Sequence, residues 1–256
     1  MKFKYKLNIK RELKITAALV VVIGIIVFTE RRQRGTSIHD ITIKMGNVRE
    51  NHYMEEGDVA SLMNLNTENL RGASLDNINL KSIEKKIKTE PFIQDADLYS
   101  DLKGNIVVKV ELRRPVARIT RNDGPDGYIA EDGTVMPVSD RYNSRVVLIS
   151  GGYARKLLNL SNLHSTEEGK QIMDLLNMIH ENEFWSAQIA EIEIDSRCRI
   201  SFFPQVGDEK IEFGRPQNME IKFSKLMIFY KEILPRVGWN KYQRVNLEYE
   251  GQIIAE

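Results

Sequence analysis

Apolar and polar positions divide the chain into one long apolar run and a series of shorter, periodic segments. Residues 15–28 read ITAALVVVIGIIVF, contain no charged side chain, and are preceded by Lys14. As a helix the run spans roughly 21 to 26 Å, short of the ~30 Å hydrocarbon core of a bilayer. Lys14, Arg31 and Arg32 can extend to the interfaces and make up much of that deficit. The pattern predicts a single transmembrane signal anchor over residues 15–29.

Two other interpretations of this run agree less well with the sequence. A cleaved signal peptide needs small residues after the apolar region, and TERRQR follows instead. A buried helix of a soluble domain should show a polar face, and this run has none. Six basic residues precede the run and four follow it closely. This asymmetry predicts a cytoplasmic tail at residues 1–14, a juxtamembrane linker at 30–37, and an extracytoplasmic chain beyond.

The next segments alternate in a way that predicts a small sheet covered by helices. Residues 38–47 show the period of two that is typical of a half-buried strand. A helix follows at 55–64. A second helix begins at Asn79, a suitable N-cap, and stops at Pro91. Strands around Ala96 and at 106–113, joined by a turn at 101–105, complete a β-α-α-β-β order. One face of such a sheet, covered by both helices, would bury all the apolar stripes.

Residues 91–93 are Pro-Phe-Ile, Ala96 stands in the following strand, and ELRRPVA at 111–117 ends the last one. This arrangement resembles the POTRA domain of the FtsQ/DivIB family of bacterial cell-division proteins. In that family a Pro-aromatic or Pro-aliphatic break precedes an Ala-containing strand, and an Arg-Arg-Pro-Val-Ala stretch ends the domain. The short N-terminal tail and the single anchor match as well. The resemblance implies a POTRA domain over residues 38–114.

The remaining residues, 115–256, resemble the second, β-rich domain of the same family. YIAEDGTVM at 128–136 matches its hairpin signature, and Asp132-Gly133 supplies the positive φ that a tight turn needs. Ser165 and Glu168 have the spacing of a capping box ahead of a helix. The other expected elements are strands at 146–149, 189–194, 199–203, 210–213 and 242–249, and a helix at 218–234 ended by Pro235 and Gly238. The fold class is therefore α+β: a transmembrane helix, a POTRA domain, and a β-rich FtsQ-type domain with flanking helices.

Composition and charge narrow the function. The 256 residues are 42% hydrophobic and 29% charged, with a net charge of +1, so neither nucleic-acid binding nor disorder is favoured. The single Cys198 excludes an intrachain disulfide, and no base stands near it in sequence for nucleophilic catalysis. The four histidines lack metal-ligand spacing. We therefore expect no enzymatic activity, cofactor, metal, nucleic acid or small-molecule substrate.

The surface that remains is suited to other proteins. An outer strand leaves backbone groups unpaired, and a strand from another chain can satisfy them. The plain alternative is a protected edge or a frayed end. The resemblance implies contacts with the small bitopic proteins FtsB and FtsL, made by the residues that match the family's terminal strand region. These residues are Tyr249, Glu250, Gly251, Gln252 and Ile253, presented by a strand that contains Val245 and Leu247. Glu248-Tyr249 replaces the family's usual Arg-Tyr or similar pair, so a basic contact there would be lost.

The resulting hypothesis is a single-pass, N-in scaffold of the divisome, in the inner membrane at the septum. It would link early and late division proteins and control septal peptidoglycan synthesis through FtsB and FtsL, with the POTRA domain binding other divisome members. The first alternative is a POTRA-bearing component of outer-membrane assembly or secretion, but the residues after Pro115 lack the regular alternating segments of a β-barrel. The second alternative, an anchored extracytoplasmic hydrolase, lacks a nucleophile–base pair.

Overall fold

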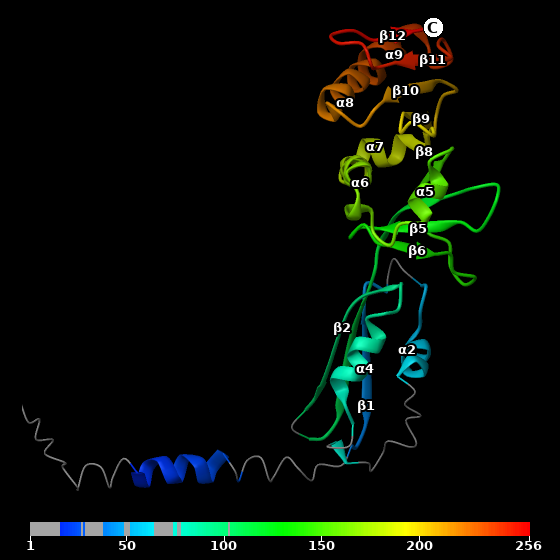
Figure 1. Cartoon of the computed structure of the whole chain (residues 1–256). Coiled ribbons are helices and arrows are strands. Elements are labelled where there is room, and N and C mark those ends of the chain that lie inside the picture. Colours follow the sequence, from blue (N-terminus) through cyan, green and yellow to red (C-terminus); the bar gives the residue numbers. More distant parts are fainter. Residues whose placement is uncertain are drawn as a thin grey trace, which may run out of the picture. The chain divides into compact units, whose positions relative to one another are not determined.

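The structure is a computed structural model that describes residues 16–26, 28, 38–48, 52–63, 74–75, 78–101 and 103–256 (Figure 1). The chain forms two compact units. The first takes the described residues within Met1–Met45, Glu56–Thr89 and Asp95–Val110. The second takes those within Gly46–Glu55, Glu90–Gln94 and Glu111–Glu256. The predicted tail at 1–14, the linker at 30–37, and residues 15, 27 and 29 of the predicted anchor lie outside the described residues.

Residues 16–26 are helical, and their side chains are exposed. Within the described ranges, no helix is both long enough and apolar enough to cross a membrane. The anchor over residues 15–29 therefore stays a prediction from the sequence.

A three-stranded sheet belongs to the amino-terminal part of the chain. Its described elements are β1 (Ile41–Gly46), α2 (Glu56–Leu62), α4 (Leu80–Ile87), β2 (Ile93–Ser100) and β3 (Ile106–Leu112), with the strand order β1-β3-β2. Alternate side chains of β3, from Ile106 to Leu112, are buried, as expected for a sheet with one covered face. Asn79 caps α4 by accepting a hydrogen bond from the Ser82 amide at 3.0 Å. The expected β-α-α-β-β order is confirmed.

The second unit is built on a nine-stranded mixed sheet. Its strands are β4 (Pro115–Ile119), β5 (Gly127–Ala130), β6 (Val135–Pro137), β7 (Val147–Ser150), β8 (Ile189–Ile194), β9 (Ile200–Pro204), β10 (Lys210–Gly214), β11 (Arg244–Asn246) and β12 (Ile254–Ala255). The order is β12-β11-β10-β9-β8-β7-β4-β5-β6. β4, β7 and β8 are parallel, as are β10 and β11, and the other pairs are antiparallel. Gly133, with φ of 78°, forms the predicted turn between β5 and β6.

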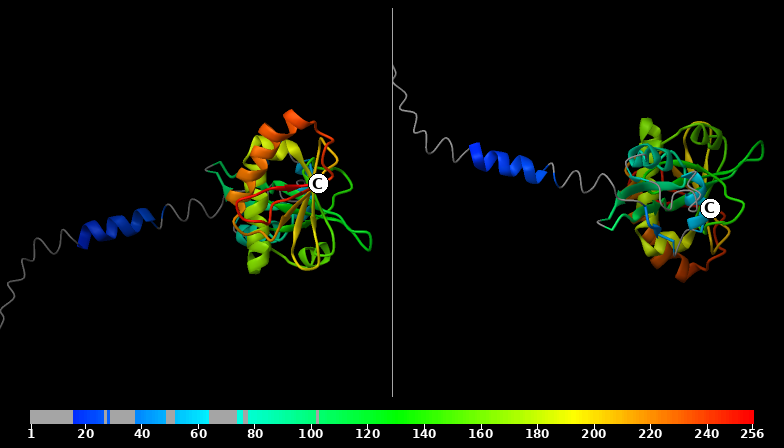
Figure 2. Two further views of the ribbon diagram at one scale, coloured as in Figure 1. Left: turned by 90° about the horizontal axis from the view of Figure 1, so that it is seen from above. Right: turned by 90° about the horizontal axis from the view of Figure 1, so that it is seen from below.

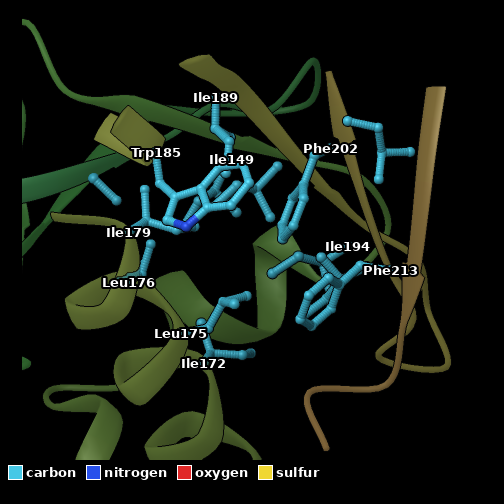
Figure 3. Packing of buried hydrophobic residues seen from close by; sticks show 14 of the residues in the cluster. Ile149, Ile172, Leu175, Leu176, Ile179, Trp185, Ile189, Ile194, Phe202 and Phe213 are labelled. Atoms are coloured by element: carbon cyan, nitrogen blue, oxygen red, sulfur yellow. The ribbon is translucent and has the colours of Figure 1, made fainter. Parts of the chain in front are cut away.

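Helices in this unit pack on the sheet and close its core. They are α5 (Ala154–Leu158), the 3₁₀ turn η2 (Leu163–Ser165), α6 (Glu167–His180), α7 (Glu183–Gln188), α8 (Met219–Ile228), the π-helical η3 (Phe229–Ile233) and α9 (Leu234–Val237). α6 and α8 lie on one side of the sheet (Figure 2). Trp185 of α7 packs among apolar side chains of α6, such as Ile179, and of the strands, such as Ile149 and Ile189 (Figure 3).

A smaller aromatic cluster lies at the β5–β6 end of the same unit. Tyr53 stacks on Phe92 at 5.2 Å and meets Tyr128 and Tyr142 edge-on. Its hydroxyl donates to Ser144 Oγ at 2.8 Å. The segments Gly46–Glu55 and Glu90–Gln94 are thus structural parts of the second unit, although the sequence places them between elements of the three-stranded sheet.

Two predicted helix boundaries are wrong. Thr166, not Ser165, caps α6 by accepting from the Gly169 amide at 3.1 Å, because Ser165 ends η2 and its hydroxyl donates to the Asn162 carbonyl. Pro235 does not end the helix predicted over residues 218–234. The chain continues through the π turn of η3 into α9, and Pro235 lies in the first turn of α9, directly after the π turn. The helix ends before Gly238.

Candidate functional site

The candidate site is the β12 side of the nine-stranded sheet. β11 pairs with β10 on one side, with Ile211 opposite Val245. On its other side β11 pairs with β12, with Val245 opposite Ala255. The predicted strand over 242–249 is therefore too long, and it is not the outer strand. β11 ends at Asn246, because the chain turns back and returns as β12.

The structure brings the predicted partner-binding residues into two groups. Val245 and Leu247 are fully buried, so they hold the strand in the core. Tyr249, Glu250, Gly251 and Gln252 are exposed and Ile253 is half-buried, in a turn rather than a strand. Gly251 adopts φ of 68° there, a conformation that favours glycine.

Among the described residues, the backbone of β12 has N–H and C=O groups on its outer side that no strand pairs with. The Arg244 amide donates to the Glu256 carbonyl at 3.1 Å, and the Glu256 amide donates to the Arg244 carbonyl at 2.9 Å. Residues in an antiparallel ladder alternate between bonded and non-bonded pairs, so the N–H and C=O of Ala255 point away from β11. Ile254 and Ala255, which form β12, were not among the predicted partner-binding residues. Gly251, which follows the alternating residues 244–249 and precedes Ile253-Ile254-Ala255, was the signal for a turn and a return strand.

Lys225 of α8 holds the turn that precedes β12. Its Nζ donates to the carbonyls of Leu247 and Tyr249, both at 2.7 Å, and of Gln252 at 3.4 Å. Burial lowers the pKa of Lys225, and the nearby charge of Glu250 opposes this effect. Lys225 was not among the predicted site residues, because its contacts are with residues far away in the sequence.

Charged side chains cover the exposed face of β8 to β11 and line a shallow hollow of about 370 Å³. Lys210 Nζ forms an ion pair with Glu193 Oε2 at 2.5 Å, and Arg244 Nε forms one with Glu212 Oε1 at 2.9 Å. The hydrogen bond to Glu212 holds the pKa of Arg244 above its usual value. Glu248, which stands where the family's basic residue was expected, is exposed and lines the same hollow. The hollow is therefore lined largely by ion-paired side chains.

A buried carboxyl group lies at the start of β10. Glu209 is fully buried, and the hydroxyl of Tyr230 in η3 donates to its Oε1 at 2.9 Å. Its Oε2 has no hydrogen-bond partner within the described part of the chain. Burial raises the pKa of Glu209, and burial together with the Glu209 charge raises the pKa of Tyr230.

Cys198 lies in the β8–β9 turn with φ of 61°. Burial raises the pKa of its thiol, which disfavours the nucleophilic thiolate. Asp195 accepts from the amides of Arg197 and Arg199 and so stabilises this turn. No group of three or more His, Cys, Asp and Glu side chains suited to a metal ion occurs among the residues that the structure describes.

In the part of the chain that the structure describes, these features define an α+β protein with a small sheet-and-helix domain followed by a large mixed sheet whose outer strand is β12 at one edge. Residues 37–111 match the family model of a POTRA-like domain. Residues 114–256 match the model described as FtsQ/DivIB, C-terminal related. Because this match covers more than half of the sequence, the chain belongs to the FtsQ/DivIB family, and the predicted resemblance is confirmed. A comparison with curated protein sequences found no match.

Proposed function

We propose that this protein is a non-enzymatic scaffold of the divisome that binds the small bitopic proteins FtsB and FtsL, with FtsB adding a strand to β12. Membership of the FtsQ/DivIB family suggests the scaffold role. Through these partners the protein would link early and late division proteins and control septal peptidoglycan synthesis.

The observation that carries this proposal is the outer side of β12. The outward N–H and C=O of Ala255 are a backbone template for an incoming strand. Tyr249, 51% exposed, stands in the adjacent turn, and aromatic side chains contribute strongly to protein interfaces. Affinity would come from main-chain hydrogen bonds, and selectivity from the side chains of the turn.

We also propose the membrane arrangement expected from the sequence. Residues 15–29 would anchor the protein in the inner membrane, with residues 1–14 in the cytoplasm and the rest outside. Residues 38–114 would form the POTRA domain, which binds other divisome members, and residues 115–256 the β domain. A fluorescent fusion tests this placement: we expect a midcell band, and an even peripheral signal would contradict the proposed role in division.

Ala255→Pro tests the strand addition, because proline removes the outward N–H that the β11 ladder does not use. The variant should keep its thermal midpoint and lose at least tenfold in affinity for the purified extracytoplasmic segment of FtsB. Ala255→Val, which keeps the N–H, is the matched control and should bind normally. Equal binding by Ala255→Pro and the parent protein would exclude β12 as the site of strand addition.

A further inference from the structure

The core of the second unit holds Lys225 in a position from which its side chain reaches the turn before β12. It lies on α8 between Phe223 and Leu226, whose side chains are buried in the core of the second unit. The helix therefore holds the lysine stem, and its ammonium group reaches the carbonyls of Leu247, Tyr249 and Gln252.

The three carbonyls that Lys225 contacts are acceptors, and its ammonium group supplies the donors that they need. Residues 248–252, here called the Lys225 turn, follow β11 directly and adopt neither a helix nor a strand. Carbonyls in such a segment need donors from outside regular secondary structure. A lysine ammonium carries three donors, and one charged group thus satisfies acceptors at both ends of the turn.

We propose that Lys225 is the positioning residue that sets the register of β12, and with it the backbone groups that β12 offers to a partner. The effect on partner binding rests on the proposed function, whereas the effect on β12 itself can be measured in the protein without a partner. The Gln252 carbonyl, which Lys225 contacts, lies two residues before β12. This contact therefore fixes how many residues separate Lys225 from Ile254, which pairs with Asn246 of β11. A slip of one residue would turn the outward groups of Ala255 toward β11.

Lys222, one turn earlier on the same helix, makes a different set of contacts. Its Nζ donates to the Arg215 carbonyl at 2.8 Å and lies 4.8 Å from the centre of the Phe213 ring. It contacts no carbonyl of the Lys225 turn in the described part of the chain. Lys222→Met is therefore a matched control for Lys225→Met, because each variant loses one charge from the same helix.

The test measures amide hydrogen exchange of the full-length protein in detergent. Lys225→Met keeps most of the side-chain volume and removes the donors. We expect the amides of Ile254 and Glu256 to exchange at least tenfold faster in this variant, with the amides of α6 unchanged. Lys222→Met should leave these two amides as they are, and Lys225→Arg, which keeps charge and donors, should retain most of their protection. Unchanged exchange in Lys225→Met, or equal loss in Lys225→Arg, would overturn the proposal.

Binding of the purified extracytoplasmic segment of FtsB separates this inference from the proposed function. We expect Lys225→Met to weaken binding at least fivefold and Lys222→Met to leave it unchanged. If Lys225→Met speeds amide exchange in β12 while Ala255→Pro still binds the FtsB segment, the proposed site is wrong and the positioning role of Lys225 is supported. If Ala255→Pro loses binding while Lys225→Met keeps both protection and affinity, the positioning role fails and the site stands.

Discussion

The two outer strands of the nine-stranded sheet differ in how their edges are treated. At β6, Thr134 forms a bridge with Asn162, and the Val135 amide donates to the Ser161 carbonyl at 3.1 Å. Pro137 closes the strand without an N–H to offer. At β12, by contrast, the ladder to β11 leaves the outward groups of Ala255 unpaired.

This difference shows that the uncovered edge is a feature of β12 and not of the sheet as a whole. Unprotected outer strands invite unwanted pairing, and proteins commonly cover them or end them with proline. The β6 edge has both kinds of protection, and the aromatic cluster around Tyr53 and Tyr128 packs beside it. An edge left open in the same sheet is consistent with use by a partner. Changes at β6 should therefore reduce stability, and changes at β12 should reduce binding.

The largest effect on stability should come from the aromatic cluster beside β6. Tyr128 is fully buried and contacts Tyr53 edge-on. Tyr128→Ala should lower the free energy of unfolding by about 3–5 kcal/mol, because it leaves a cavity in a packed cluster. Urea denaturation measures this change. A loss below about 1 kcal/mol would show that the cluster contributes little to the protected edge.

Asn162 covers the same edge through hydrogen bonds. Its Nδ2 donates to the Asp132 carbonyl, and its Oδ1 accepts from the His164 amide at the start of η2. Asn162→Ala should cost about 1–2 kcal/mol, the usual range for a lost cap together with a lost hydrogen bond. Asn159→Ala, at an exposed position nearby, is the control and should change the urea midpoint little. Equal midpoints for the two variants would contradict a covering role for Asn162.

On the β12 side, Glu209 should make stability depend on pH. Burial raises its pKa in the folded protein and the like charge of Asp208 adds to the rise, while the hydrogen bond from Tyr230 opposes it. The folded state therefore holds this proton more tightly than the unfolded state, so stability falls as pH rises from about 4.5 through the raised pKa. Glu209→Gln should remove this pH dependence and so raise the free energy of unfolding at pH 8 relative to the parent protein. Parallel stability-against-pH curves for the variant and the parent protein would contradict it.

The smallest effect on stability should come from the Lys225 turn. Tyr249 is half-exposed, so Tyr249→Ala should change the free energy of unfolding by less than about 0.5 kcal/mol. Binding of the FtsB segment should nevertheless fall several-fold, because an interface would lose an aromatic anchor. Calorimetric titration measures this affinity. Normal binding by Tyr249→Ala would restrict the contact to the backbone of β12.

Local patterns predicted several elements of this protein. Alternation predicted β3, β8 and β10 to within a residue or two, and Asp132-Gly133 predicted the β5–β6 turn. Asn79 was predicted as the cap of α4 from residue type and position alone. These features depend on the period of side chains along a strand and on backbone preferences, which neighbouring residues determine.

The candidate site was predicted only in part, because its key features depend on residues far apart in sequence. The sequence indicated the region 245–253, but the true outer strand, Ile254–Ala255, exists because the chain returns across β11. Lys225 reaches carbonyls 22 to 27 positions away, and no local pattern marks such a contact. The sequence by itself therefore determined the family and most of the elements, and it indicated the region of the candidate site. The tertiary structure decided which strand is outermost, because strand order and long-range hydrogen bonds arise only when distant segments pack together.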